Sequence, residues 1–237
     1  MAREEFKNKA FFYPLLKILW QCINVNQFPF NNLKIRLALS HAINRKEIIQ
    51  TFPFPENREP AYTALPKSLT QHYKSKFLLK EDKKQAKLYF YKALEELRLR
   101  LEDFPILYIS TTVQDRRIAE IIKLQLEGVL GIKCEIESAA WKEHWKKMTS
   151  KNYQIGVMNW TSWLDDPIYT LQSFKYADEK VNFTGWENSR FIELLDLSDQ
   201  TIDLDQRKKY HSKIWLYFCW SKFVKSFFDT QSNKEPS

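Results

Sequence analysis

The sequence predicts an α/β fold, a mixed sheet flanked by helices, and three observations support this prediction. Between residues 104 and 160, apolar or alternating segments typical of strands take turns with segments of helical period. The order strand, helix, strand, helix, strand is what βαβ connections produce. The 237 residues are 44% hydrophobic and 28% charged, which is enough to bury the core of one large domain or two small ones.

The first half of the chain is predicted to contain an extended segment, two helices and a long irregular connection. Apolar spacing puts the extended segment at 20–30, the helices at about 33–50 and 82–101, and the connection at 51–80. Asn31 or Asn32 can cap the first helix, because a short polar side chain can accept the free backbone N–H groups there. Prolines after residue 50 end that helix and keep the connection irregular.

The second half supplies the remaining strands and helices. The same pattern predicts strands at 104–111, 132–138 and 153–160, and helices at 114–130, 189–199 and 205–218, with a short helix that begins near Trp141. Within 132–138 the residues alternate strictly, so Cys134 points the same way as two isoleucines. We therefore expect Cys134 to be a small core residue and not a nucleophile.

Composition excludes several function classes. Only four glycines occur, and they cannot form either glycine-rich loop that binds nucleotide phosphates. The three cysteines and four histidines lack the short spacings of metal sites, and no nucleophile with a nearby base stands at a recognised spacing. We therefore expect no enzyme activity, no cofactor and no metal.

The chain is basic, and this leaves an alternative function open. It carries 37 Lys and Arg against 29 Asp and Glu, a net charge of +8 with a pI near 9.2. Such a charge attracts nucleic acid, anionic lipid or acidic proteins. Because acids are interleaved with the bases, a solvated basic face is the simpler interpretation, and we expect no nucleic-acid partner. A basic nucleic-acid-binding or protein-interaction module remains the alternative.

Three ordered segments carry a family resemblance. They are FPFNNLKIRLALSHAINRKEII at 28–49, GVLGIKCEIESAAWKEHWKKM at 128–148 and YQIGVMNWTSWLDDPIYTLQSF at 153–174. Together they resemble the C-terminal lobe of the solute-binding proteins that serve oligopeptide and dipeptide ABC importers, the bacterial extracellular solute-binding proteins of family 5. The first segment matches that family's helix R-x-A-L-x-x-A-I-[ND]-R at seven positions: Arg36, Ala38, Leu39, Ala42, Ile43, Asn44 and Arg45.

The resemblance implies a fold, a function and a location. It implies a single lobe of a periplasmic-binding-protein-like fold, part of a two-lobe clamp that closes on an oligopeptide without catalysis. An ABC permease in the inner membrane would be the partner, and the protein would be periplasmic or extracytoplasmic. We expect an N-terminal extension at 1–19, the lobe at 20–218 and an atypical tail at 219–237. The chain is expected to be truncated, with no signal peptide and the first lobe missing, or encoded separately.

The resemblance also implies the peptide-binding residues. In the family, tryptophans at the positions of Trp141 and Trp160 belong to the cleft, and an aspartate three residues after the second binds the peptide's amino group. Here that position is Trp163, so Asp165 or Asp166 would have to supply the carboxylate. Asp166 can instead cap the helix that starts at a proline, and Trp141 can instead face the core.

Overall fold

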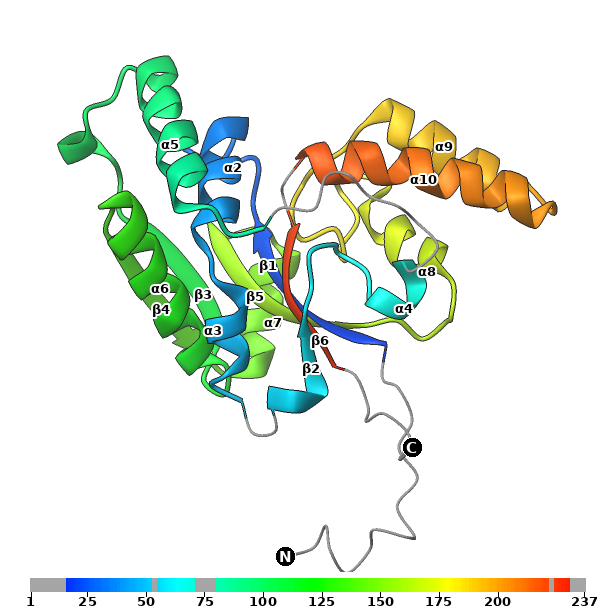
Figure 1. Ribbon diagram of the computed structural model, residues 1–237, viewed down its shortest axis with the longest axis horizontal. Helices are drawn as coiled ribbons and strands as arrows, with labels where there is room; N and C mark the ends of the chain where they lie inside the picture. Colours follow the sequence, from blue (N-terminus) through cyan, green and yellow to red (C-terminus); the bar gives the residue numbers. More distant parts are fainter. Residues whose placement is uncertain (1–15, 53–54, 71–79, 222–223, 231–237) are drawn as a thin grey trace, which may run out of the picture.

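The computed structural model describes residues 16–52, 55–70, 80–221 and 224–230 of the chain. Within these residues a six-stranded sheet runs in the order β2-β6-β1-β5-β3-β4 (Figure 1). The strands are β1 (Lys17–Ile23), β2 (Arg58–Pro60), β3 (Leu107–Thr112), β4 (Cys134–Ala139), β5 (Ile155–Thr161) and β6 (Val224–Thr230). β3 pairs in parallel with β4 and β5, whereas β1 is antiparallel to β5 and β6. The sheet is therefore mixed, as the sequence predicts.

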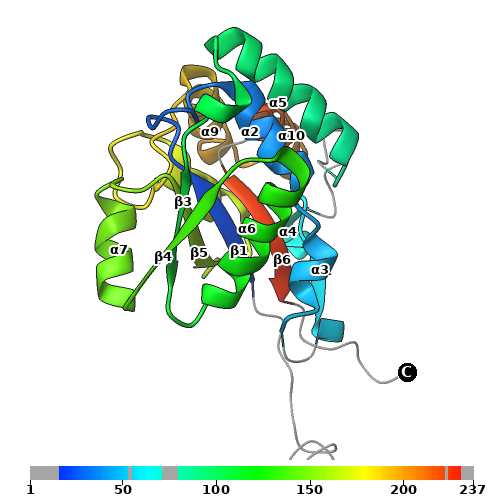
Figure 2. The same cartoon turned by 90° about the vertical axis from the view of Figure 1, so that its left-hand side faces the viewer.

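Helices cover both faces of this sheet. They are α2 (Leu33–Ala42), α3 (Arg45–Ile49), α4 (Lys67–Thr70), α5 (Lys83–Leu97), α6 (Arg116–Leu130), α7 (Trp141–Thr149), α8 (Pro167–Leu171), α9 (Ser189–Asp199) and α10 (Leu204–Ser221). Short 3₁₀ turns in the described part of the chain are η1 (Pro55–Asn57), η2 (Leu101–Asp103) and η3 (Gln172–Phe174). Figure 2 shows α2, α5 and α6 in front of the strands, while α9 and α10 lie behind them. This is the helix–sheet–helix layering that βαβ units build.

Two separate hydrophobic cores result, one on each face. The first core joins the sheet to α2, α3, α5 and α6, and its buried residues include Leu19, Ile35, Phe90, Ile109, Ile122 and Val157. The second core joins the sheet to α7, α8, α9 and α10, and includes Trp20, Met148, Met158, Leu171, Phe174, Phe191 and Ile214. β1 shows the cause, because Leu19 and Ile23 face the first core while Trp20 and Cys22 face the second.

The predicted helix at 33–50 is in fact two helices. Asn32 caps α2 through its side-chain oxygen, which accepts the N–H groups of Lys34 and Ile35. The chain then becomes extended at Ile43, and Asn44 caps α3 by accepting the N–H of Glu47 at 3.2 Å. The apolar spacing continues across this break, which is why the pattern alone predicts one helix. Further on, α9 lies at the predicted 189–199, and α6 ends at Gly131 in the left-handed conformation.

The lobe extends beyond the boundaries expected from the sequence. β1 begins at Lys17, inside the expected N-terminal extension, and β6 lies inside the expected tail at 219–237. β6 is an interior strand, since it pairs with β1 on one side and β2 on the other. The strands that pair with β6 are distant in the sequence, so the local sequence pattern does not predict this strand. Within the described residues, no helix combines the length and the apolar character needed to cross a membrane.

Candidate functional site

The parallel strands define one edge of the sheet as the candidate site. Because β3, β4 and β5 run in the same direction, their carboxyl ends meet there, and the start of β1 joins them through the pairing of Lys17 with Thr161. We call residues 112–116, 139–141 and 159–166 the carboxyl edge. Open α/β sheets bind ligands outside the carboxyl ends of their strands. The sheet topology therefore points to this edge before any side chain is considered.

Large apolar side chains are exposed at the carboxyl edge. They follow all three strands: Val113 after β3, Trp141 after β4, and Trp163 and Leu164 after β5, each more than half exposed. Trp163 is 79% exposed, an unusual state for a tryptophan. The Val113 N–H donates to the carbonyl of Ala139 at 3.1 Å, so the segments after β3 and β4 lie side by side. The edge therefore offers an uncovered apolar surface of the kind that binds partners or ligands.

Trp160 is anchored in the rim of the second core. Its ring stacks on that of Trp20 at a centroid distance of 4.9 Å and an interplanar angle of 11°. Its indole N–H donates to the hydroxyl of Thr170 at 2.9 Å, and the centroid of the Tyr169 ring lies 6.2 Å from that of Trp160. Trp160 is half-buried, so it supports the carboxyl edge while one part of the ring reaches the surface.

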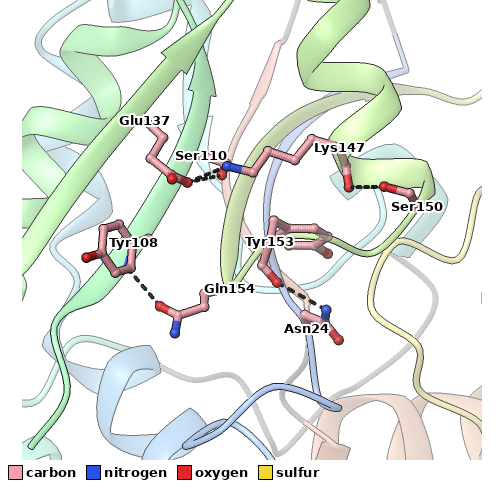
Figure 3. Close-up of polar contacts among 8 residues, drawn as sticks. All are labelled: Asn24, Tyr108, Ser110, Glu137, Lys147, Ser150, Tyr153 and Gln154. Atoms are coloured by element: carbon pink, nitrogen blue, oxygen red, sulfur yellow. Dashed lines mark hydrogen bonds and ion pairs between the residues drawn. The ribbon is translucent and has the colours of Figure 1, made fainter.

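Trp141 is placed by the attachment of α7 to the sheet. His144 is buried, and its Nε2 lies 2.9 Å from the carbonyl oxygen of Val157. Burial lowers the pKa of His144, so the neutral ring donates this bond. Figure 3 shows a second attachment, in which Lys147 forms an ion pair with Glu137, whose carboxylate also accepts the Ser110 hydroxyl at 3.1 Å. These bonds fix α7 and with it the exposed tryptophan at its first position.

Trp145, one turn further along α7, has a different environment. Its ring meets Phe183 edge to face at 5.6 Å, on the side of the second core. The rings of Trp141 and Trp145 lie 5.7 Å apart. Trp141 is 51% exposed and Trp145 39%. Trp145 therefore faces the second core in part, whereas half of Trp141 is open to solvent.

The three positions considered for an amine-binding carboxylate differ in charge, in exposure and in the partners they already have. Asp166 caps α8, since its Oδ1 accepts the N–H of Ile168 at 2.9 Å, and its Oδ2 pairs with Arg207 at 2.7 Å. The capping role proposed from the Asp-Pro sequence is thus confirmed. Asp165 is exposed to solvent, and Trp163 carries no charge. Both oxygens of Asp166 are therefore already used within the lobe.

Sequence reasoning missed one acidic residue of this edge, Asp115. It lies between β3 and α6, is half-buried, and its Oδ2 accepts the Thr112 hydroxyl at 3.0 Å and the Asn159 amide at 3.4 Å. One feature of the sequence could have indicated Asp115: it follows a predicted strand closely, and the side chains after neighbouring parallel strands lie close together. No motif marks it.

Metal-ligating side chains and thiols were the remaining candidates for chemistry among the described residues. Among them, no group of three His, Cys, Asp or Glu side chains could hold a metal ion. Cys22 and Cys134 are buried, and burial raises the pKa of both thiols, that of Cys134 to about 12. Both sulfurs are therefore protonated at neutral pH and act as small apolar groups. The prediction that Cys134 belongs to the core is confirmed.

Comparisons with known proteins agree with this geometry. The profile of the bacterial extracellular solute-binding proteins, family 5 (middle region), matches residues 3–182. The oligopeptide-binding protein OppA of Bacillus subtilis is 30% identical over 205 residues, which cover 84% of this chain and 37% of OppA. The dipeptide-binding protein DppE of the same organism is 26% identical over 186 residues, 76% of this chain and 34% of DppE. The chain thus spans little more than a third of the length of these relatives.

Solved structures extend the similarity to the fold. A periplasmic oligopeptide-binding protein of Borrelia burgdorferi superposes with a TM-score of 0.80 at 25% identity, covering 97% of this chain and 46% of the other. The substrate-binding protein CtaP of Listeria monocytogenes gives a TM-score of 0.82 at 18% identity, covering 98% of this chain and 48% of the other. The described fold therefore corresponds to a little under half of each, as one lobe of a two-lobe protein does.

Proposed function

Because the chain belongs to family 5 of the bacterial extracellular solute-binding proteins, we propose that it binds peptides and that the carboxyl edge is its binding surface. The observation that carries this proposal is the exposure of Val113, Trp141 and Trp163 where three parallel strands end. Exposed indole rings suit varied peptide side chains, since they offer flat apolar contact with little loss of conformational freedom.

In this proposal the lobe supplies one wall of a binding cleft. An extended peptide lies along the carboxyl edge and pairs its backbone polar groups with those of the cleft, while its side chains rest against Trp141 and Trp163. Trp160 supports this wall through its stack on Trp20. Asp165 and Asp166 border the wall, and Asp166 acts there mainly by holding α8. The opposite wall comes from a first lobe, whether in a longer chain or encoded separately.

The biological role follows from the relatives. OppA and DppE are named as oligopeptide- and dipeptide-binding proteins. By analogy, this chain would act outside the cytoplasm, deliver peptides to an ABC permease in the inner membrane and perform no catalysis. Binding by an added strand and by aromatic surfaces needs no covalent step, so a binding role accounts for the residues at the carboxyl edge without a nucleophile or base.

Titration of the 237-residue chain tests the proposal against its alternative. We expect a mixture of tripeptides to change the tryptophan fluorescence, with little difference between about 50 and about 200 mM salt, whereas binding to single-stranded DNA would fall steeply over that range. Binding to DNA alone would refute the proposal. The absence of a fluorescence change at millimolar peptide would refute it as well.

A matched pair of variants locates the binding surface. Trp163→Ala should weaken peptide binding by about 1–3 kcal/mol, the range of interface anchors. Tyr91→Ala is the control, because Tyr91 is 53% exposed on α5, which packs against α2 and precedes the amino end of β3, opposite the carboxyl edge. The control should bind like the parent chain. Equal affinity in both variants would remove Trp163 from the site.

A further inference from the structure

The carboxyl edge holds a carboxylate whose local contacts leave its charge uncompensated. Asp115 accepts hydrogen bonds from Thr112 and Asn159, and both donors are neutral. The nearest basic residue in the sequence, Arg116, instead pairs with Glu120 and donates to the hydroxyl of Ser138. Across the segments that the structure describes, no lysine or arginine is found in an ion pair with Asp115.

The hydrogen bonds that Thr112 and Asn159 donate to Asp115 both end on the same carboxylate oxygen. The Thr112 hydroxyl and the Asn159 amide both approach Oδ2, which leaves Oδ1 to receive a further donor. The same two contacts fix the orientation of the carboxylate, because Thr112 also accepts the backbone N–H of Asp115 at 3.1 Å. A carboxylate oriented in this way loses little conformational freedom when a cation binds.

The other aspartates of the edge are less suited to bind a cation. Asp166 already has a cationic partner, Arg207, and Asp165 is exposed to water, where an ion pair contributes little. Asp115 is half-buried beside the exposed Val113, in the row of strand ends that also carries Trp141. A ligand that covers these apolar groups would exclude water from Asp115 and strengthen its interaction with a positive charge.

We propose that Asp115 binds a primary ammonium group of the peptide, either its amino terminus or a lysine side chain; this inference rests on the function proposed above. The ammonium donates to Oδ1 in a charge-assisted hydrogen bond, and the indole rings of the edge favour a cation by interaction with their faces. Asp115 thus takes the role that neither Trp163 nor Asp166 can fill. The negative charge of Asp115 also interacts favourably with the first turn of α6, and this interaction stabilises the carboxylate when no peptide is bound.

Three peptides distinguish the two sources of the ammonium group. Ala-Phe-Ala carries the terminal ammonium, acetyl-Lys-Phe-Ala carries only the side-chain ammonium, and acetyl-Ala-Phe-Ala carries neither. The parent chain should bind at least one of the first two about 10- to 100-fold more tightly than the third, as expected for a hydrogen bond to a charged group. Whichever of the first two binds more tightly identifies the source.

Variants of the same chain assign the effect to Asp115. Asp115→Asn keeps the shape and the hydrogen bond to Thr112, and it should bind all three peptides with the affinity of acetyl-Ala-Phe-Ala. Asp115→Glu retains the charge and should recover part of the discrimination. Asp178→Asn is the matched control and should discriminate like the parent, because Asp178 is exposed in the loop that hydrogen-bonds to Lys151 and Tyr153, near the amino end of β5 and opposite the carboxyl edge. The thermal unfolding of each variant, followed by circular dichroism, establishes that it is folded.

The possible outcomes separate the two proposals. If the parent binds all three peptides equally, or if Asp115→Asn still discriminates, the role of Asp115 is refuted while peptide binding stands. If the parent binds none of them, the proposed function fails, and the inference fails with it.

Discussion

The close approach of α7 to the sheet yields a sharp prediction, because it depends on one glycine. Gly156 lies in β5, between β1 and β3, and a Cβ at this position would stand 2.3 Å from the Sδ of Met148 in α7. Non-bonded heavy atoms need roughly 3.5 Å. Met148 is completely buried in the second core, so the end of its side chain must shift against packed neighbours to make room. Gly156→Ala should therefore lower the free energy of unfolding by about 1–3 kcal/mol.

A double-mutant cycle assigns this cost to Met148. Met148→Ala alone should lower the free energy of unfolding by about 2–5 kcal/mol, because it leaves a cavity. In the double variant the new methyl group enters that cavity, so the total loss should be at least about 1 kcal/mol smaller than the sum of the single losses. Urea unfolding followed by circular dichroism measures all four free energies.

Gly128→Ala serves as the control for the glycine substitution. Gly128 lies inside α6, and nothing comes within 4 Å of the position of its Cβ. Alanine there should raise the free energy of unfolding by about 0.5–1 kcal/mol, the usual gain in a helix interior. Additive losses at Gly156 and Met148, within about 0.5 kcal/mol, would refute the reasoning that these two residues set the position of α7.

Three further substitutions test the cores and the site, each by urea unfolding. Gln21→Leu should raise the free energy of unfolding by about 1 kcal/mol, because both polar side-chain atoms of Gln21 are buried without a protein partner; a loss would contradict this. Trp160→Ala should lower it by about 3 kcal/mol through loss of the stack on Trp20, and a change below about 1 kcal/mol would contradict that packing. Burial, aided by the charge of Arg207, lowers the pKa of His211 from 6.5 to about 4. As the pH drops from 6.5 to 4, the unfolded chain therefore binds a proton at His211 that the folded chain does not bind, and the free energy of unfolding should fall. The free energy of unfolding of His211→Gln should fall less between pH 6.5 and 4. Parallel curves of this free energy against pH for the variant and the parent would refute the role of His211.

Much of the fold could be predicted because its signals are local. The βαβ order at 104–160 depends on short apolar strands and amphipathic helices, both visible within a few residues. The end of the helix at Ile43 and the strand β6 could not be predicted in the same way. The first depends on a cap at Asn44 inside a continuous apolar pattern, and the second on pairing with β1 about 200 positions earlier.

The site was predictable in part. Sequence reasoning selected Trp141 and Trp163, which are exposed at the carboxyl edge. It could not foresee that Trp160 is held by Trp20, because the stack joins two antiparallel strands about 140 positions apart in the sequence. It also gave no weight to Asp115, whose contact with Asn159 crosses 44 positions and follows only from the alignment of β3 beside β5.

Amide hydrogen exchange of the 237-residue chain, with and without a saturating tripeptide, tests the central claim most directly. The account predicts slower exchange in segments 112–116, 139–141 and 159–166, which come from three strand ends and share only their place at the carboxyl edge. The outer faces of α5 and α10 should exchange at unchanged rates. Protection confined to those helices, or none at the three strand ends, would contradict the claim that this edge holds the peptide.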